Sequence, residues 1–219
     1  MRIAFDYQAF CIQTYGGILR YFVRLVEQLI AQEQEVRVFA PFHWNHYLKE
    51  LPSGIVNGYG LKRYPPKSSR LMLPLNQFVS EIAMKQWNPH VEHETYYSKE
   101  GSVPKGIPTV ITVNDMIHEL FAAKFSPCDQ TSQMKRIAID RADHVICISE
   151  STREDLIRHF ATDDKIVSVV HLGFEDFSFV KQNCVQSLTT KRPYLLYVGG
   201  REGYKILIIL CVPLQYPKC

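Results

Sequence analysis

The chain has 219 residues, of which 46% are hydrophobic and 21% charged, an ordinary composition for a soluble globular protein. This length suits one sizeable α/β domain, or one domain plus a fragment of another. The formal net charge of +3, without a run of Lys and Arg, argues against nucleic-acid binding. A weakly basic face toward an anionic substrate or a membrane surface is an alternative to a merely solvated surface.

The sequence shows neither a signal peptide nor a transmembrane segment. The N-terminus starts with a strand-like run and not with a signal peptide, and no stretch approaches the roughly 18 apolar residues that span a bilayer. The six cysteines form no CxxC pair, which predicts reduced thiols and no zinc site. Cys147 lies in an apolar run and is expected to be buried. We therefore expect a cytoplasmic protein, with peripheral contact at the inner face of the membrane as an option.

The first elements form a strand–loop–helix–strand unit. A strand is expected at 2–7, and a loop holding Gly16 and Gly17 follows. The apolar residues Ile18, Phe22, Leu25 and Leu29 then recur at helical spacing, and a second strand is expected at 35–40. Such crossovers build parallel sheets. The later elements are expected as strands at 55–56, 60–64, 91–95, 109–113, 144–148 and 165–170, and as helices at 71–87, 130–141 and from a capping box at Ser151–Glu154 through Phe160. The fold class is therefore α/β, a Rossmann-like parallel sheet flanked by helices.

Two groups of polar residues follow predicted strands. In the run from His90 to Tyr97, His93 and Thr95 share one face of an extended chain, which indicates a substrate-facing strand end more than a metal site. After the strand 109–113, Asp115 and His118 suit acid/base or hydrogen-bonding roles. The alternative is that Asp115 caps a short helix and His118 packs at the surface.

Two glycine-rich turns suit phosphate groups. Gly16 and Gly17 lie between a strand and a helix, where the backbone can approach a ligand and a helix N-terminus attracts anions; a purely structural turn is the alternative. The segment 199–205 follows a strand and offers Arg201 and Lys205 to a diphosphate, or forms a charged surface turn. No dinucleotide fingerprint, P-loop or GxSxG elbow occurs.

Together these segments resemble the retaining glycosyltransferases of family 4 (group 1), which have the GT-B fold, and in particular bacterial enzymes of surface-polysaccharide assembly. Five segments carry the resemblance in the family's order: 16–22, 93–97, 112–119, 142–152 and 197–205. Many relatives have a His before the residue that corresponds to Asp115, after the strand 109–113, where this chain has Asn114.

The resemblance implies a nucleotide-diphosphate sugar as donor, a glycan or lipid-linked acceptor, transfer of a hexosyl group with retention, and no metal or other cofactor. It places Gly16, Gly17, Arg201 and Lys205 at the donor phosphates. Asp115 and His118 are the catalytic candidates, and His93, Thr95, Tyr96 and Ser149 are the acceptor-side candidates. A non-catalytic Rossmann-like remnant or partner-binding module is the alternative.

The resemblance also implies a domain order. Residues 1–180 are expected to form the N-terminal acceptor-side domain, 181–192 a linker, and 193–205 the first strand and phosphate turn of the donor domain. The tail 206–219 departs from the family's pattern. We expect a truncated enzyme, inactive alone, with a frameshift near Lys205; the gene sequence downstream of that codon tests this expectation.

Overall fold

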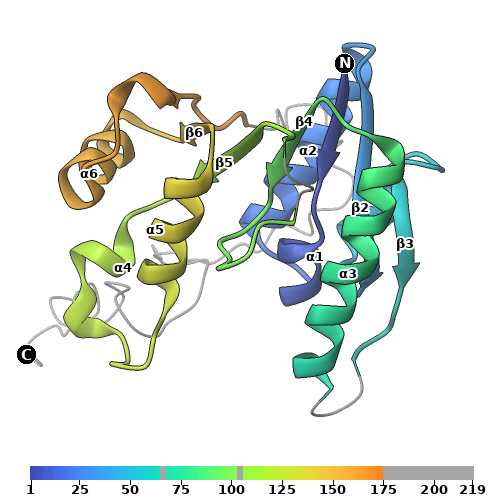
Figure 1. Ribbon diagram of the computed structural model, residues 1–219, viewed down its shortest axis with the longest axis horizontal. Helices are drawn as coiled ribbons and strands as arrows, with labels where there is room; N and C mark the ends of the chain where they lie inside the picture. The colour runs from blue at the N-terminus through green and yellow to red at the C-terminus, as the bar shows by residue number, and fades with distance from the viewer. Residues whose placement is uncertain (65–67, 103–105, 175–219) are drawn as a thin grey trace, which may run out of the picture.

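The computed structural model describes residues 1–174, except 65–67 and 103–105. Seven parallel strands form one sheet in the order β3-β2-β1-β4-β5-β6-β7 (Figure 1). This confirms the expected Rossmann-like α/β class. The expected linker 181–192, the segment 193–205 and the tail 206–219 lie outside the described residues. The strands are β1 (Arg2–Phe5), β2 (Glu35–His43), β3 (Val56–Gly60), β4 (Val91–Glu94), β5 (Thr109–Val113), β6 (His144–Cys147) and β7 (Val167–Val169).

Helices cover both faces of the sheet. The α-helices are α1 (Gln8–Ile12), α2 (Gly17–Ala31), α3 (Ser69–Trp87), α4 (Ile117–Leu120), α5 (Thr131–Arg141) and α6 (Glu150–Phe160), and the 3-10 helices are η1 (Tyr47–Glu50), η2 (Ala122–Lys124) and η3 (Asp164–Ile166). Phe5 packs in the cluster with α2, whereas its neighbour Ala4 packs with Met84 of α3 on the opposite face. This alternation follows from the twofold side-chain period of a strand.

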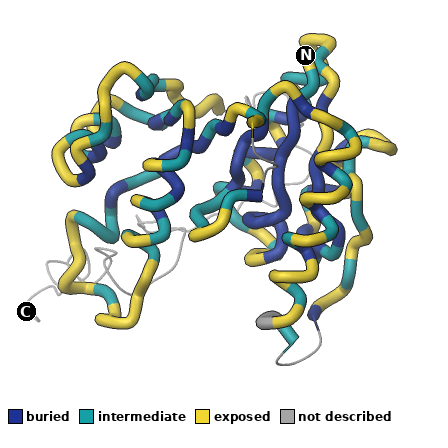
Figure 2. The backbone as a smooth tube through the Cα atoms, viewed as in Figure 1, coloured by how far each residue is buried: buried dark blue, intermediate teal, exposed yellow. Residues whose placement is uncertain are grey.

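A second core lies under α5 and α6. Residues of β5 and β6, including Ile111, Val145 and the buried Cys147, pack with Ala138 of α5 and Leu156 of α6. The central strands β1 and β4 are mostly buried, and the tube in Figure 2 is dark blue along the centre of the sheet, whereas the edge strand β3 is largely exposed. The expected burial of Cys147 is thus confirmed. The three described cysteines, Cys11, Cys128 and Cys147, are free thiols.

The structure corrects two predicted elements and adds one. The strand expected at 60–64 is wrong, because β3 ends at Gly60, and the short helix α1 was not expected. The second strand continues through Pro41 to His43 instead of ending at Ala40. Its pairing with β3 shifts register between Phe39 and Phe42, an irregularity of the kind at which a sheet tolerates a proline.

The N-cap of α6 is Ser149, not the expected Ser151. Ser149 has extended backbone angles, and its hydroxyl accepts a 3.1 Å hydrogen bond from the amide of Thr152. The helix therefore begins at Glu150, one residue before the proposed capping box. A serine cap is preferred because it satisfies one of the first-turn amides.

We expect Ser149→Ala to lower the free energy of unfolding by about 1 kcal/mol, because that amide loses its acceptor. Ser151→Ala is the matched control; it lies within the first turn and should change stability by less than about 0.5 kcal/mol. Urea unfolding followed by circular dichroism measures both. Equal losses for the two variants would contradict the assignment of the cap.

Candidate functional site at the carboxyl edge of the sheet

The strand order reverses between β1 and β4, the two central neighbours of the sheet. β1 leads toward β2 and β3 on one side, while β4 leads toward β5, β6 and β7 on the other (Figure 1). In open parallel sheets, ligands bind beyond the carboxyl ends of strands at such a switch point. The loops that follow β1, β4 and β5 therefore form the candidate site.

Asp6, directly after β1, joins the two halves of this edge. It is fully buried, and its carboxylate accepts hydrogen bonds from the Thr95 amide at 2.9 Å, the Ser102 hydroxyl at 2.8 Å and the Gln8 amide at 3.2 Å. The Thr95 hydroxyl also donates to it. Burial raises the pKa of Asp6, and these hydrogen bonds oppose the rise. The sequence interpretation missed this residue, although an acidic residue directly after a buried strand was a usable signal.

The glycine loop lies at the N-terminus of α2. Gly17 is the first residue of this 15-residue helix, whose first turn holds no acidic side chain. A Cβ atom at Gly17 would meet nothing within 4 Å, whereas one at Gly16 would lie 2.4 Å from Oε1 of Gln13. The backbone at Gly17 is therefore open, and a helix N-terminus attracts anions such as phosphate groups.

Tyr96 is the acceptor-side candidate that the structure brings to this loop. Its half-buried ring lines a small recess together with residues of α1 and the start of α2: Ala9, Ile12, Gln13, Ile18 and Leu19. Burial, followed by the negative charges of Asp115 and Asp129, raises the pKa of Tyr96. The tyrosine is thus a neutral hydroxyl at neutral pH and can donate or accept a hydrogen bond.

His93 and Thr95 lie inside the protein. His93 Nε2 is 2.9 Å from the Thr112 hydroxyl, and the ring stacks on Phe5 with a centroid distance of 5.4 Å. Burial lowers the pKa of His93 to about 4, so the imidazole is neutral at neutral pH. Thr95 accepts from the Ala9 amide at 3.0 Å while it donates to Asp6. Both residues hold the end of β4 in place beneath Tyr96.

Asp115 and His118 flank the start of the short helix α4, and each has its own partner. Asp115 Oδ1 accepts from the Ile117 amide at 3.1 Å, which supports the first turn of α4 from the residue before its N-cap, Met116. His118 stacks on Phe125 at 4.1 Å between centroids, and its Nε2 lies 3.7 Å from Asp129 Oδ2. The structure therefore places both residues at the start of α4, and neither of them lines the recess at Tyr96.

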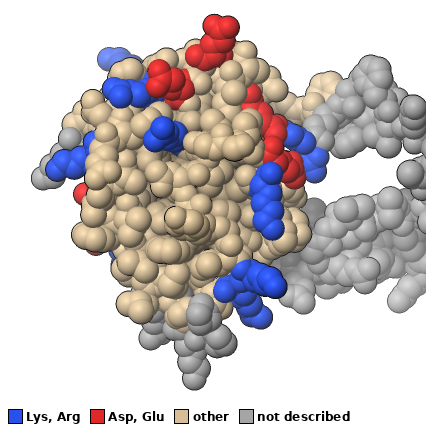
Figure 3. Space-filling model, turned by 90° about the vertical axis from the view of Figure 1, so that its right-hand side faces the viewer, with Lys and Arg blue, Asp and Glu red and all other residues tan. Residues whose placement is uncertain are grey.

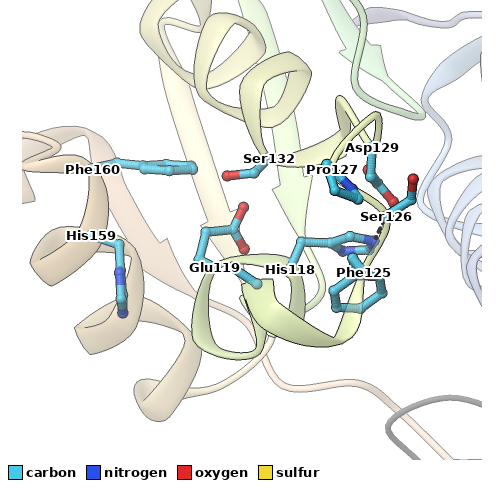
Figure 4. A pocket seen from close by; sticks show the side chains of 10 residues that line it. His118, Glu119, Phe125, Ser126, Pro127, Asp129, Ser132, His159 and Phe160 are labelled. Carbon is cyan, nitrogen blue, oxygen red and sulfur yellow. Dashed lines mark ion pairs between the residues drawn. The ribbon is translucent and has the colours of Figure 1, made fainter.

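His118 also faces a larger pocket of about 460 Å³ (Figure 4). Helices α4, α5 and α6 and the loop 125–129 form its wall, and the lining includes Glu119, Asp129, Ser132, His159 and Phe160. Glu119 is held by Lys135, whose Nζ donates to its carboxylate at 2.8 Å and to the Asp115 carbonyl at 2.9 Å. Polar side chains opposite an aromatic ring suit a small ligand that carries hydroxyl groups.

The remaining candidates divide between the described and the undescribed parts of the chain. Ser149 follows β6 at the same carboxyl edge, where its hydroxyl caps α6. Arg201 and Lys205 lie outside the described residues. In the described part of the chain, no three His, Cys, Asp or Glu side chains are arranged to hold a metal ion, and no helix is long and apolar enough to cross a membrane.

The fold is that of a Rossmann-like α/β domain, and its switch point is the candidate ligand site. Residues 15–176 match the sequence profile of Glycosyltransferase Family 4, and the chain belongs to this family. A crystal structure of a glycosyltransferase from Rickettsia africae ESF-5 is similar, with a TM-score of 0.48 and 13% identity. The similarity covers 78% of this chain but only 43% of that one. No curated protein matches the chain.

Proposed function

We propose that the chain forms the acceptor-side domain of a transferase that moves a hexosyl group from a nucleotide-diphosphate sugar to a glycan or lipid-linked acceptor. The observation that carries this proposal is the open backbone of Gly17 at the N-terminus of α2, whose next residue, Ile18, lines a recess together with Tyr96. Helix N-termini stabilise phosphate groups, and a tyrosine hydroxyl can orient a sugar. Membership of Glycosyltransferase Family 4 supports the reaction class.

The residues divide the task as follows. Gly16 and Gly17 approach the donor phosphates, where Arg201 and Lys205 supply positive charge to the leaving diphosphate. Asp115 and His118 act at the reacting hydroxyl, and the pocket beside His118 has the size and polarity for an acceptor sugar. Tyr96 and Ser149 contact the acceptor, while His93 and Thr95 fix the end of β4 that carries Tyr96. Retention of configuration, and a cytoplasmic location, belong to the same proposal.

The open space at Gly17 permits a clean test. We expect Gly17→Leu to fold normally and to raise the Kd for a nucleotide-diphosphate sugar at least tenfold, because the new side chain occupies the approach to the helix N-terminus. Titration calorimetry with UDP-glucose, GDP-mannose and dTDP-rhamnose measures the effect. Gly173→Leu is the control, since a Cβ atom there also meets nothing within 4 Å.

Equal weakening by both variants, or binding unchanged by Gly17→Leu, would contradict the placement of the donor phosphates. A wild-type chain that binds none of the three nucleotide sugars would favour the alternative, a non-catalytic partner-binding module.

A further inference from the structure

Helix α3 presents its apolar side chains to the solvent. Leu71, Leu75, Phe78 and Ile82 recur at intervals of three or four residues, so they share one face of the helix. They are 73%, 40%, 63% and 44% exposed, respectively. We call these four residues the outward stripe. A helix that packs on a globular core normally turns such a stripe inward, because burial of apolar surface is favourable.

The middle of the inward face of α3 is polar, between Met72 and the fully buried Met84. Asn76 and Ser80 are completely buried. Asn76 Oδ1 accepts from the Phe42 amide at 2.8 Å and its Nδ2 donates to the Phe42 carbonyl at 3.2 Å, while the Ser80 hydroxyl donates to the Phe39 carbonyl at 3.3 Å. These backbone groups flank the register shift of β2 around Pro41, where the pairing with β3 is irregular.

These hydrogen bonds hold α3 in its inverted orientation. Rotation of the helix to bury the outward stripe would leave the amide of Phe42 without its acceptor, a cost of about 1–3 kcal/mol, whereas the Phe42 carbonyl would keep the Tyr64 hydroxyl as a donor. The fold therefore fixes the outward stripe in an exposed position. A surface that covers the stripe would remove apolar area from water.

The charge around the stripe is positive. Lys62 and Arg63 are exposed just before α3, and residues 61–82 include four Lys or Arg against one acidic residue, Glu81. Figure 3 views the molecule from the β3 side, where Lys and Arg border an uncharged lower area and most acidic side chains lie above it. A second copy of the chain would bring the same positive charge to this face, whereas an anionic lipid surface complements it.

We propose that the outward stripe, together with Lys62 and Arg63, docks the protein on an anionic membrane surface. The apolar side chains enter the boundary between head groups and acyl chains, and the cations meet the lipid phosphates. This inference does not depend on the proposed glycosyl transfer, because it concerns a helix that contributes no residue to the candidate site.

Sedimentation with vesicles tests the proposal. We expect the full chain to bind equimolar phosphatidylglycerol and phosphatidylcholine vesicles at low salt, and the double variant Leu75→Ser/Phe78→Ser to lose at least tenfold in partition coefficient. Leu120→Ser/Phe121→Ser is the matched control, since these residues are 43% and 49% exposed away from α3. Circular dichroism verifies that each variant is folded.

The contribution of charge to vesicle binding is tested separately. Lys62→Gln/Arg63→Gln, added salt, and vesicles of phosphatidylcholine alone should each weaken binding, because exposed charges are screened by salt and need anionic lipid. Binding that is unchanged in the Leu75→Ser/Phe78→Ser variant overturns the proposal. So does a wild-type dimer, seen by sedimentation velocity, that this variant converts to a monomer without any vesicle binding, because that result assigns the stripe to a second copy.

Discussion

Arg141→Met should lower the free energy of unfolding by about 3–5 kcal/mol, measured by urea unfolding near neutral pH. Arg141 Nη2 lies 2.9 Å and 2.7 Å from the two carboxylate oxygens of Glu94, whose side chain is only 1% exposed. The guanidinium also donates to the carbonyl groups of Ser98 and Lys99. Its loss leaves a buried carboxylate without a counter-charge and releases the loop that follows β4.

The same substitution at an exposed pair provides the control. Arg158 is 68% exposed and lies 3.4 Å from Asp155, so Arg158→Met should cost less than about 1 kcal/mol. The double variant Arg141→Met/Glu94→Gln should recover part of the loss, because it removes the stranded charge. Similar losses for Arg141→Met and Arg158→Met would show that the buried pair does not stabilise the fold.

Glu92→Gln should increase stability at alkaline pH by about 1–3 kcal/mol. Glu92 is fully buried, and neither of its carboxylate oxygens has a hydrogen-bond partner among the described residues. Burial, followed by the negative charges of Asp6 and Glu94, raises the pKa of Glu92 well above its usual value of 4.5. A neutral amide in this position does not have to lose a proton as the pH rises.

The sign of the pH dependence follows from this raised pKa. The folded state binds the Glu92 proton more tightly than the unfolded state, so its contribution to stability is complete below the unfolded pKa and is lost as the pH rises through the folded pKa. Glu94, with its pKa raised to about 7 by burial against the opposing effect of Arg141, adds a loss of the same sign between 4.5 and about 7.

Urea unfolding of wild type and Glu92→Gln across the pH range measures this difference. We expect the two proteins to agree most closely under acid conditions and to diverge as the pH rises. Glu154→Gln, at an exposed position of α6, is the control and should follow the wild type throughout. Parallel stability curves for wild type and Glu92→Gln would contradict a raised pKa for Glu92.

The polar residues at the end of β4 show how much of the candidate site can be predicted from the sequence. The run from His93 to Tyr96 predicts that polar side chains gather at the end of a strand, and in the structure this run covers the last two residues of β4 and the two that follow. Which of them face outward is a different matter, because His93 packs on Phe5, Phe22 and Thr112, which belong to other elements. A local pattern does not contain these contacts, so Tyr96 could not be separated from its buried neighbours.

The orientation of helix α3 is likewise not contained in the local sequence pattern. Its spacing predicts a helix over 71–87, and the helix forms, but helical periodicity does not say which side meets the sheet. That choice depends on the backbone of β2 at Phe39 and Phe42, which needs the hydrogen bonds of Asn76 and Ser80. An irregular strand far earlier in the chain therefore turns the apolar side of α3 outward.

The sequence by itself determined the alternation of strands and helices, the parallel sheet and the family, because hydrophobic period and motif order are properties of neighbouring residues. Only the tertiary structure decided the burial of His93 and Thr95, the joining role of Asp6 and the orientation of α3. Burial depends on side chains that are distant in the sequence, and the sheet brings them together only when its seven strands are in register.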